Sequence, residues 1–421
     1  MINYNTIGSN IKRKILGFSE KISEGLTRPE FKFVSQMIYG MLSAQSCHLS
    51  KIARKLDEKA SLKKVIDRLS NNLNAFNDGQ KLFVNYIKKI KGFINEKTIL
   101  IVDGGDVTKP CSPKLEGIAT VRDGSTGKLE KGYNTLEATA LTPERKMPVS
   151  VYTTVYSAAE KGFVSEDNEV LKSLDFLSEH FKKGNIRAFD RGYDANIYYE
   201  RLIGKKELFI IRAKKNRDVI YKDKRINIYE LAKQFKGKYC LKFTKKNGVI
   251  TDCKISIVPI KLPCKPKTKL NLVICNGLGM APLMLITSLG NDDDRLAVAI
   301  TKVYLMRWRI EEFYRFKKQQ FGFEDFRVQS LKSIRNLNML LSITIGFIGM
   351  MSEKTDERRI SMEVIHISKR IYDAPKFNYY ALADGLFEIF AKLRQGIAEM
   401  LNKKPKSLQL SLFPDLGFGI A

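Results

Sequence analysis

A short run of apolar and β-branched residues, Thr98 to Val102, most constrains what this chain can fold into. The run predicts a β-strand that ends at Asp103. A strand with no polar residue on either side is typical of a sheet whose two faces are both covered by helices. The pattern therefore favours an α/β fold with a carboxylate at the end of this strand.

The following segments continue the alternation of strands and helices. Strands are predicted at 148–156, 186–189 and 207–212, and a helix at 166–181. Asp190 comes directly after the second of these strands. Because ligand sites of α/β sheets form beyond the carboxyl ends of strands, Asp103 and Asp190 are candidate site residues.

Residues 10 to about 95 show apolar residues at helical spacing and predict a helical region. Two short amphipathic helices, 49–56 and a second that begins after Ser61 and ends near 75, suit a helix-turn-helix. The second helix has outward-facing residues of the types that contact phosphates and base edges: Lys63, Lys64, Asp67, Arg68, Asn71 and Asn72. The alternative is an ordinary solvated helix of a bundle.

The second half of the chain changes character twice. Residues 214–290 combine Gly, Pro and Lys with short alternating runs, which predicts a mostly β insertion. Asp292 to Asp294 then predict the start of a long helix that ends near Gln320, and the chain is helical beyond it. The predicted domains are 1–95, 96–213, 214–290, 291–365 and a C-terminal helical region, 366–421.

The net charge is +28 and the calculated pI is about 9.7. Residues 201–270 hold 21 lysines and arginines against 5 acids, and residues 1–100 hold 18 against 8. This concentration favours a polyanionic partner, most plausibly nucleic acid, over the alternative of a lysine-rich surface that serves solubility.

Cysteine and histidine usage limits the chemistry. The chain has six cysteines without a C-x-x-C pair and three histidines, which argues against a zinc site or a disulfide framework. The longest apolar run, 337–351, is interrupted by Asn338 and falls short of the roughly 18 residues of a spanning helix. We expect an intracellular soluble protein with no membrane partner, in which carboxylates hold any metal.

One face of the long helix carries Tyr304, Arg307, Glu311 and Lys318. Their spacing brings the four side chains to the same side of a regular helix. The simplest alternative is a surface ion pair between Arg307 and Glu311. Together with Asp103 and Asp190, however, Glu311 gives three carboxylates that suit Mg²⁺, and two-metal phosphoryl transfer needs no His, Cys or Ser nucleophile.

These motifs resemble those of a known family. The stretch from Tyr304 to Lys318 is similar to the Y-x2-R-x3-E-x6-K signature of DDE transposases of the insertion-sequence-four family. Asp190-Arg-Gly-Tyr193 resembles the second-aspartate motif of that family, and Ile101-Val-Asp103 resembles its first-aspartate strand. The resemblance implies an α/β RNase H-like catalytic core with a mostly β insertion, an N-terminal helical DNA-binding domain and a C-terminal helical region.

The resemblance also implies residue roles. Asp103, Asp190 and Glu311 would be the catalytic ligands of two Mg²⁺ ions, with Mn²⁺ able to substitute. The transposon-end phosphates would be held by Tyr304, Arg307 and Lys318. The resemblance also implies DNA contacts by Trp308, Arg212 and Lys214. The alternative for Trp308 is a core aromatic, and the alternative for Arg212 and Lys214 is a solvated strand end.

The implied function is a transposase that cuts and joins double-stranded DNA as a homodimer, in the cytoplasm of a bacterium at the nucleoid. A domesticated regulator that binds DNA without cutting it, and a nuclease or resolvase on the same fold, are the alternatives. Asp106 competes with Asp103 as first acid, although strand register and the family pattern favour Asp103. Leu283 stands where some hairpin-forming relatives have Trp, so a hairpin intermediate remains open.

Overall fold

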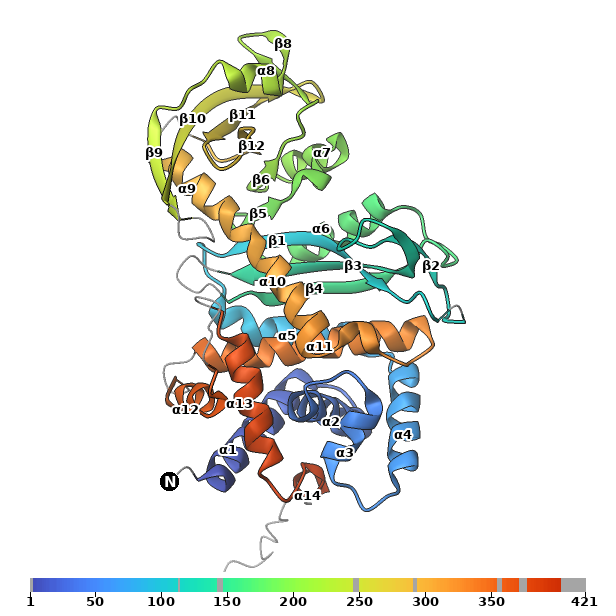
Figure 1. Ribbon diagram of the computed structural model, residues 1–421. Coiled ribbons are helices and arrows are strands. Elements are labelled where there is room, and N and C mark those ends of the chain that lie inside the picture. The colour runs from blue at the N-terminus through green and yellow to red at the C-terminus, as the bar shows by residue number, and fades with distance from the viewer. Residues whose placement is uncertain are drawn as a thin grey trace, which may run out of the picture.

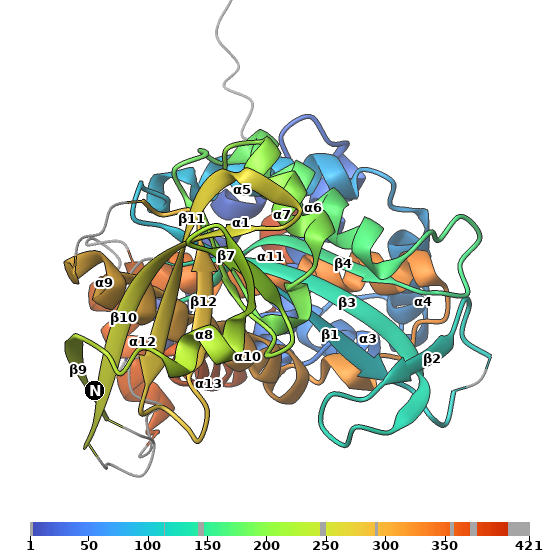
Figure 2. The same ribbon diagram turned by 90° about the horizontal axis from the view of Figure 1, so that it is seen from above.

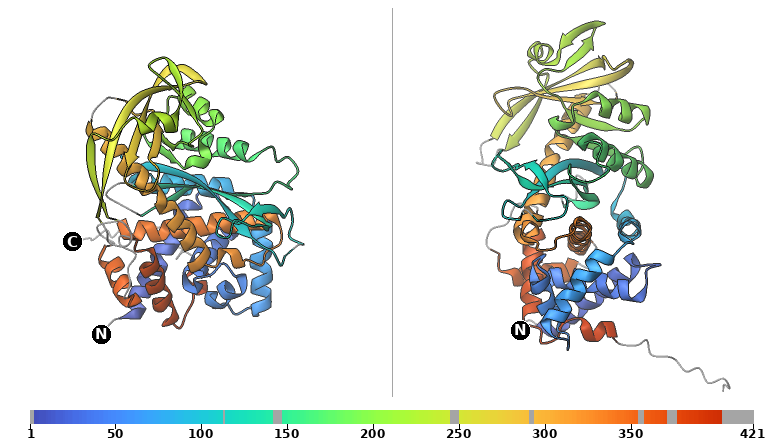
Figure 3. Two further views of the ribbon diagram at one scale, coloured as in Figure 1. Left: turned by 45° about the horizontal axis from the view of Figure 1, so that its top comes forward. Right: turned by 90° about the vertical axis from the view of Figure 1, so that its right-hand side faces the viewer.

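The computed structural model of the protein describes residues 3–112, 114–141, 147–244, 250–290, 294–353, 358–370 and 377–402. Figure 1 shows a mixed α/β part above a group of helices that come from both ends of the chain. A helical segment runs from the upper part down to the lower one, and the side view in Figure 3 shows the two parts stacked.

The lower part is helical, as predicted. Its N-terminal helices are α1 Tyr4–Ile22, α2 Arg28–Ala44, α3 Leu49–Leu56, α4 Leu62–Ala75 and α5 Gly79–Ile90, and its C-terminal helices are α11 Leu331–Glu353, α12 Arg358–Ser368, α13 Tyr379–Ala391 and α14 Ala398–Asn402. Their buried side chains belong to one hydrophobic cluster. The helices from the two chain ends therefore support one another.

The predicted helix pair is present in this group. Helix α3 has the predicted bounds, and α4 begins after Ser61, whose side chain makes no capping hydrogen bond. Along α4, Val65, Leu69 and Leu73 are buried at helical spacing. The polar residues of its opposite side face outward, as expected of either a recognition helix or a solvated helix.

The upper part contains one mixed sheet, which has twelve strands within the described residues. The strands are β1 Ile99–Thr108, β2 Ala119–Arg122, β3 Leu129–Leu141, β4 Val149–Tyr156, β5 Ile186–Phe189, β6 Phe209–Arg212, β7 Asp218–Tyr221, β8 Lys224–Asn227, β9 Tyr239–Thr244, β10 Ile250–Leu262, β11 Lys265–Asn276 and β12 Leu283–Thr287. Helices α6 Glu166–His180, α7 Asn196–Gly204 and α8 Ile228–Lys233 connect them.

The sheet is parallel only at its centre. Strand β1 pairs in parallel with β5, and β5 with β6, whereas β3 is antiparallel to β1 and β4 is antiparallel to β3. On the other side of β6, strands β12, β11 and β10 continue the sheet in antiparallel pairs. The strands predicted as an insertion thus extend the central sheet, as Figure 2 shows from above.

The helical segment that follows the insertion is not one regular helix, in contrast to the prediction. It consists of α9 Asp294–Leu305, a 3-10 turn at Met306–Trp308, α10 Arg309–Arg315 and a π turn at Phe316–Gln320. The π turn directs the neighbouring Lys317 and Lys318 to different partners, Lys317 into the core and Lys318 towards Asp106. Asp292 and Asp293, part of the predicted helix start, lie outside the described residues.

Helix α11 contains the longest apolar run of the sequence. Leu331–Ser352 is long and apolar enough to cross a membrane by length and composition, but 94% of its most hydrophobic window is buried inside the protein. Burial of this kind is typical of a core helix, and α11 lies beneath the sheet with α2, α4 and α5 around it.

The structure corrects the prediction that the first strand ends at Asp103. Strand β1 continues to Thr108, because β3 pairs with it along its whole length, from Ile99 to Thr108. Strands β2 and β3 were not predicted at all. Part of the predicted C-terminal region, residues 403–421, lies outside the described residues.

Candidate active site

Two aspartates and an arginine lie at equivalent positions on three neighbouring strands. The last residue pair between β1 and β5 is Val102 with Phe189, and Phe189 also pairs with Ile211 of β6. Asp103, Asp190 and Arg212 each follow one residue later. Because paired positions on parallel strands present their side chains on the same face, the register of the sheet brings these three groups together.

Helix α10 supplies a third carboxylate, Glu311, which Arg307 links to Asp103. The Arg307 Nη1 atom lies 2.8 Å from Asp103 Oδ2, and its Nη2 atom lies 2.6 Å from Glu311 Oε1. The planar guanidinium thereby holds one carboxylate from β1 and one from the helix. Arg307 lies in the 3-10 turn, and its side chain is 11% exposed.

A small apolar cluster packs the beginning of α10 against β1 and β5. Ile310 packs with Ile99 and Ile101 of β1 and with Ala188 of β5. These residues lie two to four positions from Arg307 or from the two aspartates in the sequence. The position of the charged groups is therefore set by apolar contacts next to them.

Asp190 has two further partners. The Tyr304 hydroxyl donates a hydrogen bond to Asp190 Oδ1 over 3.3 Å, and Arg212 Nη1 lies 3.8 Å from the same oxygen. Tyr304 is buried, whereas Arg212 and Asp190 are partly exposed. Asp190 therefore faces the side of the site that is open to solvent.

The electrostatics of the site centre on Asp103. Burial raises the pKa of Asp103 to about 7, with Asp190 and Glu311 adding to the rise and Arg307 opposing it. For Arg307, burial works against the charged form, but Asp103 and Asp190 outweigh it and raise its pKa. Burial, together with Asp190, raises the pKa of the Tyr304 phenol to about 12. The site holds more acid than Arg307 alone balances, which is favourable for a further cation.

The donor set suits a hard cation, although the carboxylates are not gathered around one point. Within the described residues, no group of three His, Cys, Asp or Glu side chains is close enough to hold a metal ion. Carboxylate oxygens are the ligands that Mg²⁺ prefers. In this arrangement the separation of Asp103 and Glu311 is set by Arg307, which lies between them.

A separate ion pair joins Lys318 to Asp106, which lies three residues beyond Asp103 on β1. Lys318 Nζ lies 3.4 Å from Asp106 Oδ2 and 2.9 Å from Glu324 Oε1. The other Asp106 oxygen accepts a hydrogen bond from the Gly124 backbone N–H over 3.0 Å. Asp106 thus binds Lys318 and a neighbouring turn, and Arg307 contacts Asp103 instead.

The two remaining predicted DNA contacts are on the surface. Trp308 is 40% exposed, with the Arg309 guanidinium 5.0 Å from the centre of its ring, which disagrees with the alternative of a core aromatic. Lys214 is exposed, and its backbone N–H donates to Asp194 Oδ2 over 2.7 Å. Asp194 also binds Arg217, so this buried carboxylate fixes the loop that carries Lys214.

Tyr314 is a site residue that the sequence analysis missed. Its hydroxyl donates a hydrogen bond to the Asp103 carbonyl oxygen over 2.8 Å. Its ring lies over Gly105, where an added Cβ would come within 3.0 Å of the ring and 2.9 Å of Thr135 Oγ1. Two consecutive glycines directly after Asp103 were a sequence signal for such a close approach.

Two comparisons find known proteins to which this chain is similar. Residues 94–347 match the family described as "Transposase DDE domain". No curated protein is significantly similar to the sequence. Among solved structures, the fold is similar to "Cryo-EM structure of piggyBac transposase synaptic complex with hairpin DNA (SNHP)", with a TM-score of 0.45, 10% sequence identity and coverage of 97% of this chain and 83% of that chain.

The matched region covers more than half of the chain. It begins before β1, ends within α11, and contains both aspartates as well as the segment with Arg307 and Glu311. By this match, the protein belongs to the DDE-domain transposases.

Proposed function

We propose that this protein is a DNA transposase of the insertion-sequence-four family. It binds the terminal inverted repeats of its element, cleaves the ends by Mg²⁺-dependent hydrolysis and joins the 3′-OH ends to target DNA. The observation that carries the proposal is that Arg307 bridges Asp103 and Glu311, while Asp190 follows the parallel strand next to β1 and its charge also acts on Arg307.

Asp103, Asp190 and Glu311 would hold two divalent ions, Mg²⁺ or Mn²⁺. When bound, such ions activate the attacking oxygen and stabilise the leaving oxygen in phosphoryl transfer. Arg307 holds two of these carboxylates in its fork, and its guanidinium would have donors for a phosphate oxygen if either carboxylate held a divalent ion instead. Tyr304 and Arg212 are close enough to Asp190 to contact DNA at the same site, and Lys318, which pairs with Asp106 further along β1, would add a phosphate contact.

The core is proposed to be RNase H-like. The supporting observation is the order β4-β3-β1-β5-β6, with antiparallel pairs up to β1 and parallel pairs after it. The acids sit on β1 and directly after β5, and the β-rich residues between β6 and α9 interrupt this core. Residues 1–95, with the exposed polar side of α4, would recognise the end sequence, and Trp308 and Lys214 would add surface contacts to DNA.

The active form is proposed to be a homodimer bound to two element ends, acting on the nucleoid in the bacterial cytoplasm. The high positive charge supports a DNA partner, because each contacted phosphate releases counterions and strengthens binding at low salt. Leu283 is buried at the start of β12 and offers no aromatic platform for a flipped base. A hairpin intermediate is therefore a separate question for the product analysis below.

The test is cleavage of a labelled inverted-repeat duplex with Mg²⁺, analysed on a denaturing gel that separates nicked, hairpin and blunt products. Asp190→Asn and Glu311→Gln should abolish cleavage and leave end binding nearly intact, because both substitutions keep the size of the side chain. Unchanged cleavage by either variant contradicts the metal assignment. Binding by the wild-type protein without any cleavage would instead support a non-cutting regulator, and cleavage without regard to sequence would support a nuclease.

A further inference from the structure

A polar pocket lies between the helix pair α3 and α4 and the chain that follows the π turn. Its volume is about 520 Å³, within the range of about 300–1,000 Å³ that is usual for ligand pockets. One wall is the beginning of α3, the second is one side of α4, and the third is the segment between Arg327 and Ser333. It thus lies where the predicted helix pair meets the chain that leads into α11.

The lining consists mainly of hydrogen-bonding side chains. Hydroxyl and amide groups come from all three walls: Ser50, Ser70, Asn71, Asn74, Gln329 and Ser330. Arg327 supplies a guanidinium, His48 supplies an imidazole, and Asp67 is the single carboxylate of the lining. The lining has no Phe, Tyr or Trp side chain on which a nucleic-acid base could stack.

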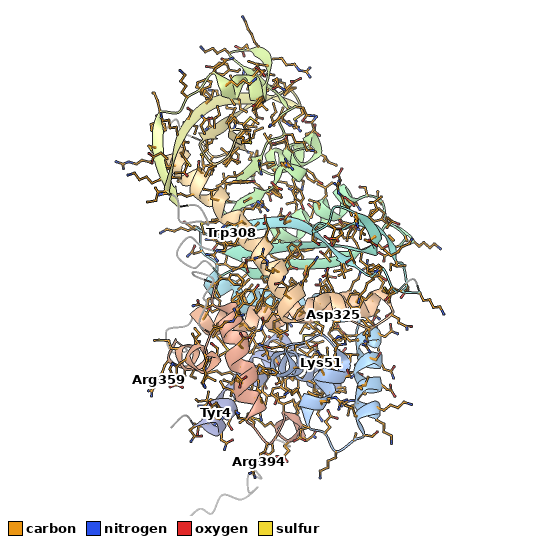
Figure 4. All side chains as sticks on the ribbon, in the orientation of Figure 1. Tyr4, Lys51, Trp308, Asp325, Arg359 and Arg394 are labelled. Carbon is orange, nitrogen blue, oxygen red and sulfur yellow. The ribbon has the colours of Figure 1, made fainter. Side chains whose placement is uncertain are left out.

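Positive charge surrounds this pocket. Burial, followed by the charges of Lys51 and Arg327 and the smaller effect of Lys109, lowers the pKa of His48, and only Asp325 opposes them. Lys51 and Arg327 are exposed and extend into solvent. Figure 4 shows Lys51 and Asp325 below Trp308, on the side of the molecule that is crossed by the signature segment, Tyr304–Lys318.

The pocket walls are joined to one another and to α11 by hydrogen bonds. The Cys47 N–H donates to the Phe321 carbonyl at the end of the π turn over 2.9 Å. Asn336 of α11 donates to the Leu73 and Phe76 carbonyls at the end of α4 over 2.8 and 3.0 Å. Ser330 donates to Asn74 over 2.7 Å. Helix α4 therefore cannot move independently of the chain that follows the π turn without breaking these bonds.

We propose that this pocket binds phosphate groups of the transposon-end DNA, with Arg327 as the main charged contact and the surrounding hydroxyls and amides as hydrogen-bond donors. Guanidinium, hydroxyl and amide groups are the usual phosphate contacts in protein–DNA interfaces. A DNA backbone bound here would contact α4 and the segment between Arg327 and Ser333 together. The proposal rests on the proposed function and adds a binding site outside the signature residues.

The test compares Arg327→Gln with Arg359→Gln, which removes an exposed charge that pairs with Glu363 on α12, on the other side of the helical part. Binding of the full-length protein to a fluorescent inverted-repeat duplex is measured over a series of KCl concentrations. Arg327→Gln should weaken binding by about tenfold and lower the slope of log K against log salt by about one, as expected for one lost phosphate contact. Arg359→Gln should leave both nearly unchanged.

A second variant, Ser70→Leu, fills the pocket without changing the charge and should weaken binding to a similar extent. Thermal unfolding of each variant checks that the fold is intact. Single methylphosphonate substitutions in the duplex identify the phosphate, because the substitution that weakens wild-type binding should have no further effect on Arg327→Gln.

Equal binding and equal salt slopes for Arg327→Gln and Arg359→Gln overturn the pocket proposal, even if the wild-type protein cleaves its ends normally. Weaker binding by Arg327→Gln in a protein that never cleaves supports the pocket and contradicts the proposed function. An effect on binding that no single phosphate substitution reproduces also overturns the proposal, because the pocket would then accept another partner, such as an acidic peptide.

Discussion

Lys317 and Glu137 are 180 residues apart in the sequence and form a buried ion pair next to the strand that carries Asp103. Lys317 Nζ lies 2.9 Å from Glu137 Oε2, and the side chains are 3% and 1% exposed. The Lys317 amino group also donates to Asn338 and Ser342 of α11, and Glu137 also accepts from Ser150 and Thr153 of β4. Glu137 on β3 lies directly opposite Asp103 on β1 in the sheet. The ion pair with Lys317 therefore links the signature segment to the strand that carries Asp103.

Lys317→Met should therefore lower the free energy of unfolding by about 3–5 kcal/mol, because it leaves Glu137 charged and buried without its partner. The double variant with Glu137→Gln should regain part of this loss. Urea denaturation measures both. The matched control is Lys233→Met, which removes an exposed pair with Glu230 and should leave the free energy of unfolding nearly unchanged. Equal losses of unfolding free energy for Lys317→Met and Lys233→Met would contradict a stabilising role for the buried pair.

Asp103→Asn should stabilise the metal-free protein at neutral pH. The pKa of about 7 in the folded state lies above the value near 3.8 of an unperturbed Asp, so the folded state binds more protons than the unfolded state between these values. The free energy of unfolding of the wild-type protein should fall as pH rises through this window.

Urea denaturation in EDTA at pH 5 and pH 8 tests this linkage. At about 1.4 kcal/mol per pKa unit, the gain for Asp103→Asn should reach about 2–4 kcal/mol at pH 8 and shrink towards pH 4. A variant that is less stable than the wild-type protein at pH 8 would mean that the ion pair with Arg307 outweighs the burial of Asp103.

Gly105→Ala should impair cleavage more than stability. The added methyl group would lie closer to Thr135 Oγ1 and the Tyr314 ring than van der Waals contact allows. Tyr314 would have to move, which weakens its hydrogen bond to the Asp103 carbonyl. We expect a cleavage rate at saturating DNA that is lower by at least about tenfold, which corresponds to about 1.4 kcal/mol. Gly184→Ala is the control, since nothing lies within 4 Å of its added Cβ. Similar rates for both variants would refute the role of this close approach.

Arg212→Gln should weaken end binding with little effect on folding. Its ion pair with Asp190 is long, 3.8 Å, and both side chains are partly exposed, so the free energy of unfolding should change by less than about 1 kcal/mol. The salt slope of binding to the inverted-repeat duplex should fall by about one. A slope equal to that of the wild-type protein would assign Arg212 to the solvated strand end instead.

Local sequence patterns were sufficient for much of the fold. Helix α3 and strand β5 have the predicted bounds. Most of their apolar residues, such as Ile52 and Phe189, are buried, so the spacing of the apolar residues carries the information. The candidate site was predictable for a related reason, because Asp103 follows the apolar residues of β1 and Asp190 follows β5.

Strand β3 could not be predicted in the same way. It contains Glu130, Lys131 and Glu137, and Glu137 is buried because Lys317 reaches it from a distant part of the chain. The 3-10 and π turns of the signature segment were missed because they depend on the contacts of Arg307 and Lys317 with other elements. Elements whose polar residues are compensated over long sequence distances leave no local pattern.

The register of the central strands has a consequence for how this sequence can change. Asp103, Asp190 and Arg212 meet because each lies one residue beyond a shared pair, Val102 with Phe189 and Phe189 with Ile211. Insertion of a single residue within 99–102 or 186–189 would turn the following side chain to the opposite face of the sheet. Additions in the loops at the outer edge of the insertion shift no such pair. Length variation among descendants of this gene should therefore be confined to the periphery of the sheet, while the spacing inside these two short strands stays constant.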